Sequence, residues 1–226
     1  MLCPLPTDLI IFAAMDLILP QIQSYAESLS TKENDLLNEV HQFTLQHHSE
    51  YQMLSGHLQG KFLEMISCMI RPHRILEIGT FTGYSGLCLA KGLQQDGELH
   101  TIELREKDAS TARNYFSKSD YASKIILHQG NAKEIIPVLH EEWDLVFIDA
   151  DKPGYIEYFN LVFPQVKKNG FILADNIFFH GQVIEEPVNG KNAKAIIAFN
   201  EFISARTDIE KVAITLRDGL YLIKKL

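Results

Sequence analysis

Residues 74–83 read RILEIGTFTG and decide the fold, because a short apolar strand here runs into a glycine-bearing turn that opens a helix. Four more strand-like runs follow, near 98–103, 124–128, 144–148 and 171–174. Helix-like segments separate the runs, near 84–94, 106–118, 131–140 and 155–167. This alternation predicts a parallel sheet covered by helices on both faces.

The end of the chain predicts two further strands. A helix near 191–205 leads to apolar runs at 211–215 and 220–223, with Asp218 and Gly219 as a turn between them. We expect an antiparallel hairpin at one edge of the sheet. The fold class is therefore a doubly wound, mainly parallel α/β sheet of seven strands, a Rossmann-like arrangement with a C-terminal antiparallel hairpin.

The region before the sheet is helical in pattern, because apolar residues recur at helical intervals from residue 16 to residue 70. Ser30 with Glu33 predicts a capping box at the start of one helix, and Pro72 the end of another. We expect one domain over 1–226, with an extension at 1–14, helices at 15–71 and the α/β core at 72–226.

Composition narrows the class of protein. A formal charge of −8 argues against an overall basic surface for nucleic acid, although a local basic patch is compatible with it. No segment predicts a membrane span or a signal peptide, so we expect a cytoplasmic protein. The cysteines, Cys3, Cys68 and Cys88, lack close spacing and predict buried free thiols in a reducing compartment.

Two strand ends carry oxygen ligands. Asp149 follows the run at 144–148, and Asp175 with Asn176 follows the run at 171–174. Either acid alone is most often a cap or turn former, but together they suit a hard cation, Mg²⁺ first, with Ca²⁺ or Mn²⁺ as alternatives. Lys152 beside such a cation is a candidate base, because a dication favours the neutral amine.

The turn after the first strand predicts a cofactor without phosphates. Phe81 stands where a dinucleotide fingerprint has its second glycine, and the lysine of a phosphate-binding loop is absent. Glu103 ends the second strand about two dozen residues after Gly79, where an acidic residue meets ribose hydroxyls. A ribose without phosphates points to S-adenosylmethionine, whereas Gly79 and Gly83 alone predict only a tight turn.

These residues match a known family. From about Gln52 to Leu226 the chain resembles the cation-dependent, S-adenosylmethionine-dependent O-methyltransferases, which include caffeoyl-CoA and catechol O-methyltransferases and small bacterial relatives. The matching stretches are LEIGTFTGYS (76–85), TIE (101–103), FIDADK (147–152), ADN (174–176) and DGL (218–220).

The resemblance implies a role for each matching position. The metal ligands would be Asp149, Asp175 and Asn176, and the catalytic residues Lys152 and Asp149. The S-adenosylmethionine pocket would contain Ser55, Glu77, Gly79, Thr80, Ser85, Glu103, Ala132 and Asp149. Lys152, Asn176 and His180 would face a small phenolic substrate, a vicinal diphenol such as caffeic acid or its CoA ester. Relatives are commonly homodimers, which we therefore expect here.

Two alternatives stay open. A bacterial branch of the family methylates a hydroxylated uridine in tRNA, for which a basic patch could come from Lys107, Arg113, Lys118, Lys124 and Lys133. The other alternative is a non-catalytic S-adenosylmethionine-binding protein that kept the fold and lost the reaction.

Overall fold

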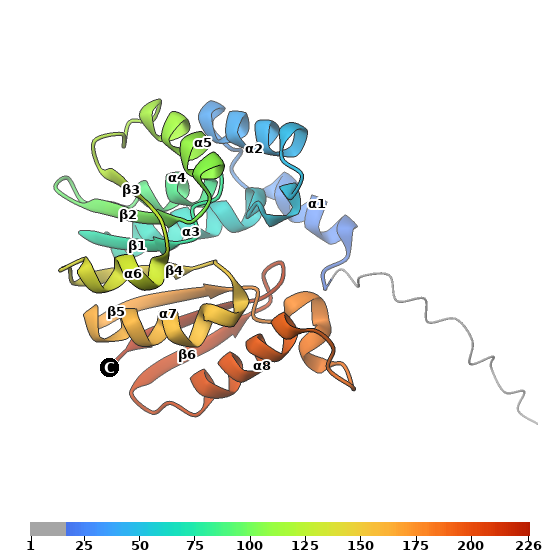
Figure 1. Cartoon of the computed structure of the whole chain (residues 1–226). Coiled ribbons are helices and arrows are strands. Elements are labelled where there is room, and N and C mark those ends of the chain that lie inside the picture. The colour runs from blue at the N-terminus through green and yellow to red at the C-terminus, as the bar shows by residue number, and fades with distance from the viewer. Residues whose placement is uncertain (1–16) are drawn as a thin grey trace, which may run out of the picture.

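The computed structural model describes residues 17–226 (Figure 1). The predicted extension at 1–14 and Cys3 lie outside the described residues. Within the described part, no helix combines the length and apolar character that a membrane crossing requires.

The core is one seven-stranded sheet. Its strands are β1 (Arg74–Ile78), β2 (Glu98–Glu103), β3 (Ile125–Gln129), β4 (Trp143–Ile148), β5 (Val166–Asp175), β6 (Ile209–Ile214) and β7 (Leu220–Lys225). The strand order is β3-β2-β1-β4-β5-β7-β6. Neighbours from β3 to β5 pair in parallel, and β7 pairs antiparallel with both β5 and β6. The predicted doubly wound sheet and its C-terminal hairpin are confirmed.

Helices cover both faces of the sheet (Figure 1). They are α1 (Pro20–Leu29), α2 (Asp35–His47), α3 (Gly56–Ile70), α4 (Tyr84–Ala90), α5 (Glu106–Ser117), α6 (Ala132–Ile135), α7 (Tyr155–Val162) and α8 (Lys191–Ser204). Alternate residues of a strand point to opposite faces, so Ile75 joins the cluster under α2 to α5 and Leu76 the cluster under α6 to α8. This two-sided burial explains why the strands read as nearly continuous apolar runs.

The strand order reverses between β1 and β4. From β1 the chain moves outward to β2 and β3, then returns to place β4 on the other side of β1. The segments that leave β1 and β4 therefore diverge to opposite sides, and the crevice between them lies at the carboxyl ends of the strands. This is where the sequence predicts the site.

The N-terminal helices differ from the prediction in how they begin. Ser30 closes α1, and Asn34 caps α2 by accepting a hydrogen bond from the Leu37 amide at 2.8 Å. The predicted capping box of Ser30 and Glu33 is therefore wrong. The Glu33 carboxylate instead accepts hydrogen bonds from His41 and from Tyr84, which lies far along the chain.

Three further expectations need correction. β5 begins at Val166 rather than near 171, because Asn169 at φ 63° with Gly170 keeps the polar segment 167–170 within the strand. α6 is one short turn followed by a 3₁₀ turn, η2 (Ile136–Val138), which contains Pro137. Cys68 and Cys88 are both free thiols. Cys88 is buried as expected, but Cys68 on α3 is exposed.

Candidate functional site

A cavity of about 500 Å³ opens at the carboxyl ends of the parallel strands. Residues from the ends of β1, β2, β4 and β5 line it. The predicted site residues that line it are Ser55, Gly79, Thr80, Ser85, Glu103, Ala132, Asp149, Lys152, Asp175, Asn176 and His180. The fold thus brings together residues from positions 55 to 180, and among them Gly79, Glu103, Asp149 and Asp175 follow strand ends as predicted.

Gly79 allows the two central strands to end against each other. It adopts φ 101°, and a Cβ added there would lie 2.0 Å from the carbonyl oxygen of Asp149. The Asp149 amide also donates to the Ile78 carbonyl at 2.9 Å. The backbone contact leaves no room for a side chain at Gly79, so the turn is open on the cavity side.

Glu77 is the one predicted site residue that does not line the cavity. It is fully buried on β1, where its carboxylate accepts a hydrogen bond from the Thr101 hydroxyl at 2.5 Å. Thr101 also shares a hydrogen bond with Thr80, which does line the cavity. Burial, together with the charges of the nearby Asp149 and Glu103, raises the pKa of Glu77 to about 8. Glu77 supports the cofactor turn from behind, which corrects the prediction that it lines the pocket.

Glu103 is held at the end of β2. One carboxylate oxygen accepts from the Phe81 amide at 2.8 Å, and the other accepts from the Arg105 amide at 2.9 Å. Burial raises the pKa of this carboxyl despite both hydrogen bonds. Because each carboxylate oxygen can accept a second hydrogen bond, Glu103 remains able to bind a diol in the cavity.

Lys152 gathers the oxygen atoms of the acidic end of the cavity. Its Nζ donates to Oδ1 of Asp149 at 3.1 Å, to Oδ1 of Asn176 at 2.7 Å and to the Tyr155 hydroxyl at 2.7 Å. Tyr155 in turn donates to the Asp175 carbonyl at 3.0 Å. Two of the three predicted metal ligands therefore face one point, which the lysine ammonium approaches.

Asp175 lies beside this point and is only 1% exposed. Its Oδ1 accepts from the Asn176 amide at 2.8 Å and its Oδ2 from Nε2 of Gln59 at 2.7 Å. Burial raises the pKa of Asp175, and the negative charge of Asp149 raises it further. The carboxylates of Asp149 and Asp175 thus repel each other where burial limits their hydration, and a cation bound between them would stabilise both.

Asn176 and His180 are oriented by Asp218. Asn176 has φ 56°, a left-handed conformation that asparagine tolerates, and its side-chain amide donates to Asp218 at 3.3 Å. Asp218 also accepts from the His180 amide at 2.5 Å. The His180 side chain itself is 63% exposed, so it lies at the rim of the cavity.

Sequence reasoning missed three residues of the site. Tyr155 holds Lys152, Gln59 holds Asp175, and Arg217 contacts Gln59. Tyr155 follows Lys152 by three residues, a spacing that could have indicated the contact. Gln59 and Arg217 carry no such signal, because they meet only through the fold.

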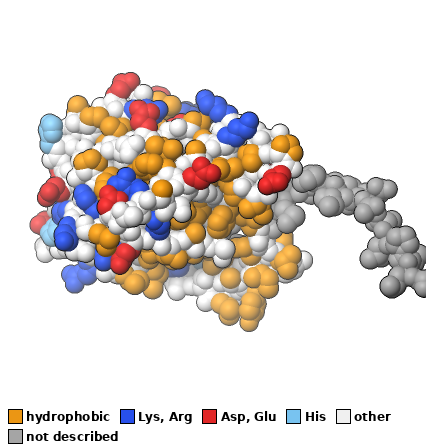
Figure 2. All heavy atoms as spheres, turned by 90° about the horizontal axis from the view of Figure 1, so that it is seen from below, with side chains coloured by type: hydrophobic (Ala, Val, Ile, Leu, Met, Phe, Trp, Pro, Cys, Tyr) orange, Lys and Arg blue, Asp and Glu red, His pale blue; other side chains and the backbone are white. Residues whose placement is uncertain are grey.

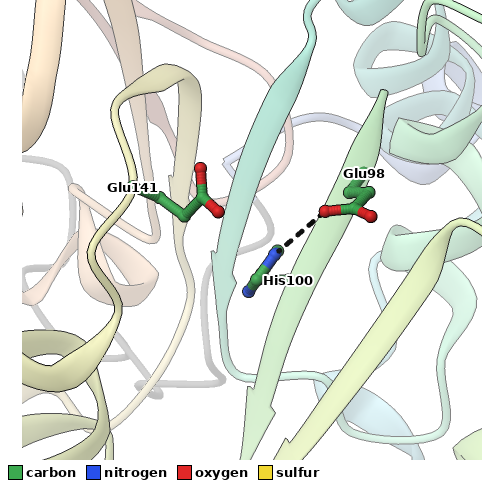
Figure 3. A group of neighbouring side chains, drawn as sticks. All are labelled: Glu98, His100 and Glu141. Carbon is green, nitrogen blue, oxygen red and sulfur yellow. Dashed lines mark ion pairs between the residues drawn. The ribbon is translucent and has the colours of Figure 1, made fainter. Parts of the chain in front are cut away.

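A second group of potential metal ligands lies at the amino ends of the strands. Glu98, His100 and Glu141 have ligand atoms within 4.8 Å of one another (Figure 3). However, Arg74 donates to Glu141 at 3.0 Å and lies 3.7 Å from Glu98. The Arg74 guanidinium already pairs with both carboxylates, so this group is an ion-pair cluster remote from the cavity.

The basic residues considered for RNA are largely paired. Arg113, Lys118 and Lys133 form ion pairs with Glu106, Glu39 and Glu157 respectively. On the face drawn in Figure 2, basic side chains lie among acidic and hydrophobic ones. The ion pairs of Arg113, Lys118 and Lys133 weaken the argument for phosphate contacts by these residues.

Comparisons with known proteins identify similar O-methyltransferases. Catechol O-methyltransferase of Niastella koreensis is 34% identical over 156 residues, covering 67% of this chain and 71% of that protein. Probable caffeoyl-CoA O-methyltransferase 2 of Dictyostelium discoideum is 30% identical and covers 91% of each chain.

Solved structures share the fold over nearly the whole chain. SAH-bound PaMTH1 of Podospora anserina has a TM-score of 0.84 at 28% identity and covers 92% of this chain and 98% of its own. The O-methyltransferase TomG of Streptomyces achromogenes, solved with SAM, has a TM-score of 0.82 at 29% identity, with 91% and 96% covered. The sequence model of the O-methyltransferase family matches residues 27–226, and the chain belongs to this family.

Proposed function

We propose that this O-methyltransferase transfers the methyl group of S-adenosylmethionine to a hydroxyl of a vicinal diphenol, with a divalent cation held by Asp149, Asp175 and Asn176. One observation carries the proposal. The oxygen atoms of Asp149 and Asn176 meet at Lys152, within the same cavity that Gly79 and Glu103 line. A cofactor end and an acidic, lysine-bearing end thus share one space.

The cofactor end suits S-adenosylmethionine. Gly79 leaves backbone open to the cavity, and Glu103 has free acceptor capacity for the two ribose hydroxyls. Ser55, Ser85 and Ala132 complete this end of the cavity with small side chains. PaMTH1 was solved with SAH and TomG with SAM, which supports S-adenosylmethionine as the cofactor here.

The acidic end suits a hard divalent cation. Its donors are carboxylate and amide oxygens, the ligands that Mg²⁺ prefers, with Ca²⁺ and Mn²⁺ as alternatives. Burial and, to a lesser degree, the negative charge of Asp149 raise the pKa of Asp175, and a bound cation would favour the ionised carboxylate there. When bound, the cation would orient both hydroxyls of the diphenol and favour ionisation of the attacking one.

Lys152 would receive the proton that leaves the attacking hydroxyl. Three partners fix its amine beside the proposed ligands, so the proton acceptor is held in place before substrate binds. It must release one proton first, since the ammonium has no lone pair. Phe81, Leu54 and Phe179 add apolar surface to the cavity and would limit water around the reacting oxygen and sulfonium methyl.

We also expect a homodimer, and exposed apolar side chains support this. Leu19, which precedes α1, and Tyr25 and Leu29 on α1 are 66%, 63% and 70% exposed, and Met69 on α3 is 74% exposed. Such a surface favours burial against a partner. Light scattering after size-exclusion chromatography would give twice the chain mass for a dimer, and the chain mass alone would contradict it.

Methyl transfer from radiolabelled S-adenosylmethionine tests the proposed function. Caffeic acid, with two adjacent hydroxyls, should be methylated in the presence of Mg²⁺, and p-coumaric acid, with one, should not. Label in unmodified or hydroxylated tRNA without label in any catechol would instead favour the tRNA alternative. Binding of S-adenosylmethionine without transfer to either class would favour a non-catalytic protein.

A further inference from the structure

The geometry points to Arg217 as a specificity-determining residue that binds an anionic group, such as a carboxylate, on the methyl acceptor. This inference rests on the proposed function and adds to it the charge of the substrate. Arg217 lies in the loop between β6 and β7 and lines the cavity near Asp175 and Asn176. It therefore faces the acidic end, where the acceptor would bind.

The Arg217 guanidinium has more N–H donors than its two hydrogen bonds use. Its Nη1 donates to Oε1 of Gln59 at 3.2 Å and its Nη2 to the Gln52 carbonyl at 3.4 Å. Both partners are neutral. Among residues 17–226, no carboxylate lies within 4.0 Å of the Arg217 guanidinium. With five N–H donors in a fixed fork, the side chain can still bind a planar carboxylate through two hydrogen bonds.

The other basic residues that line the cavity already lie beside acids. Lys152 pairs with Asp149 at 3.1 Å. Arg105 pairs with Asp108 at 2.6 Å and also contacts Glu50. His180 lies 3.9 Å from Asp218. In a cavity whose wall includes the carboxylates of Glu103, Asp149, Asp151, Asp175 and Asp218, an anionic acceptor would be repelled unless a cation received it. Arg217 is the cation in a position to do so.

The backbone at Arg217 supports a functional role. Its φ of 48° lies in the left-handed region, which an arginine adopts at a cost and a glycine adopts freely. A strained residue at the wall of a cavity is a recognised mark of function. The loop therefore has an arginine at a position where glycine would adopt the same backbone conformation without strain.

Gln59 positions this arginine. It is 1% exposed and connects two functional groups, accepting from Arg217 and donating to Asp175 at 2.7 Å. Through Gln59 the guanidinium is held at a set place relative to the acidic end. The anionic group of the acceptor would thus bind on the side of the cavity formed by η1 (Tyr51–Met53) and α3.

The test compares two acceptors of equal length, one anionic and one neutral. Caffeic acid carries a carboxylate where caffeyl alcohol carries a neutral hydroxymethyl group. We expect the ratio of kcat/KM for the acid to kcat/KM for the alcohol to fall about tenfold or more in Arg217→Asn, mainly through KM for the acid. Asparagine tolerates the left-handed backbone, so the variant should fold. Arg217→Lys should recover part of the ratio, because it keeps the charge but not the fork.

The controls distinguish a failure of this inference from a failure of the proposed function. Lys107→Gln removes one charge from an exposed residue of α5 that does not line the cavity, and should leave the ratio unchanged. If wild type methylates both acceptors and Arg217→Asn keeps the wild-type ratio, the inference is overturned while the proposed function stands. If Arg217→Asn lowers both kcat/KM values equally, the arginine acts on Asp175 rather than on the acceptor, and the inference is again overturned. If wild type methylates neither acceptor, the proposed function fails and the inference with it.

Discussion

Gly79 and Asp149 meet at the junction of β1 and β4 so closely that a Cβ atom at Gly79 would lie 2.0 Å from the Asp149 carbonyl oxygen. This contact joins the proposed cofactor turn to the first proposed metal ligand. It also occurs where the strand order reverses, so the backbone itself sets the distance between the two ends of the site.

Gly79→Ala should therefore disrupt both ends of the site. We expect a loss of roughly 3 kcal/mol or more in unfolding free energy, because steric overlap with backbone adds to left-handed strain. Urea unfolding checks this. Gly181→Ala is the control, since Gly181 has φ 79° but its added Cβ would meet only Leu17 at 3.5 Å. It should lose about 1 kcal/mol, and equal losses for both variants would contradict the steric account.

Glu77 predicts a pH dependence of stability. Its pKa rises from 4.5 to about 8 on folding, because burial disfavours the charged form. The folded protein thus binds more protons than the unfolded chain between these values, and the contribution of Glu77 to stability falls as pH rises through this window. The Glu77→Gln side chain cannot titrate. The difference in unfolding free energy between this variant and wild type should therefore shift in favour of the variant by up to roughly 1.4 kcal/mol per pH unit as pH rises through this window. Urea unfolding at pH 5, 6, 7 and 8 measures the difference, and a constant difference would contradict the buried, protonated carboxyl.

Gln59 should tune the affinity of the acidic end for metal. Gln59→Ala leaves Oδ2 of Asp175 without its 2.7 Å hydrogen bond, which orients that carboxylate. Loss of such a supporting partner typically weakens metal binding about 10–100-fold. Titration with Mn²⁺ followed by electron paramagnetic resonance measures it. Gln94→Ala, which removes a hydrogen bond to the Arg71 carbonyl at an exposed site, should retain wild-type affinity. Unchanged Mn²⁺ affinity in Gln59→Ala would count against Asp175 as a ligand.

Lys152→Met should separate binding from reaction. We expect kcat to fall by about 10²–10⁴-fold, the usual contribution of a positioned proton acceptor. Affinity for S-adenosylhomocysteine, measured by calorimetry, should change far less, because Gly79 and Glu103 form the other end of the cavity. Lys133→Met is the matched control, since Lys133 pairs with Glu157 outside the cavity wall. A Lys152→Met enzyme with near-wild-type kcat would exclude the proposed base.

Local patterns predicted most of the sheet because its strands are buried on both faces. The bounds of β1 and β2 match the expected runs at 74–78 and 98–103. β5 was harder to delimit, because the apolar run begins only at Phe171, after the polar residues Lys167, Lys168, Asn169 and Gly170. The left-handed Asn169 lets the chain pass through this polar segment and continue the strand.

The site residues also divide into those that local sequence predicts and those that only the fold brings together. Asp149, Asp175 and Glu103 could be predicted because they stand at strand ends, and strand ends of a parallel sheet meet. Gln59 could not, because its partners Asp175 and Arg217 lie 116 and 158 residues away in sequence. Glu77 was assigned to the cavity because the family resemblance implies a pocket role for its position. Which face of β1 carries its side chain depends on packing against Thr101, which only the structure gives.

Metal dependence of methyl transfer to caffeic acid tests the central claim most directly. Wild-type enzyme would be assayed with labelled S-adenosylmethionine after EDTA treatment, and again after Mg²⁺ is restored. The account predicts that transfer stops with EDTA and returns with Mg²⁺, and that Asp149→Ala shows no such return. Transfer to caffeic acid that continues at the same rate in excess EDTA would contradict the role of Asp149, Asp175 and Asn176 as ligands of a required cation.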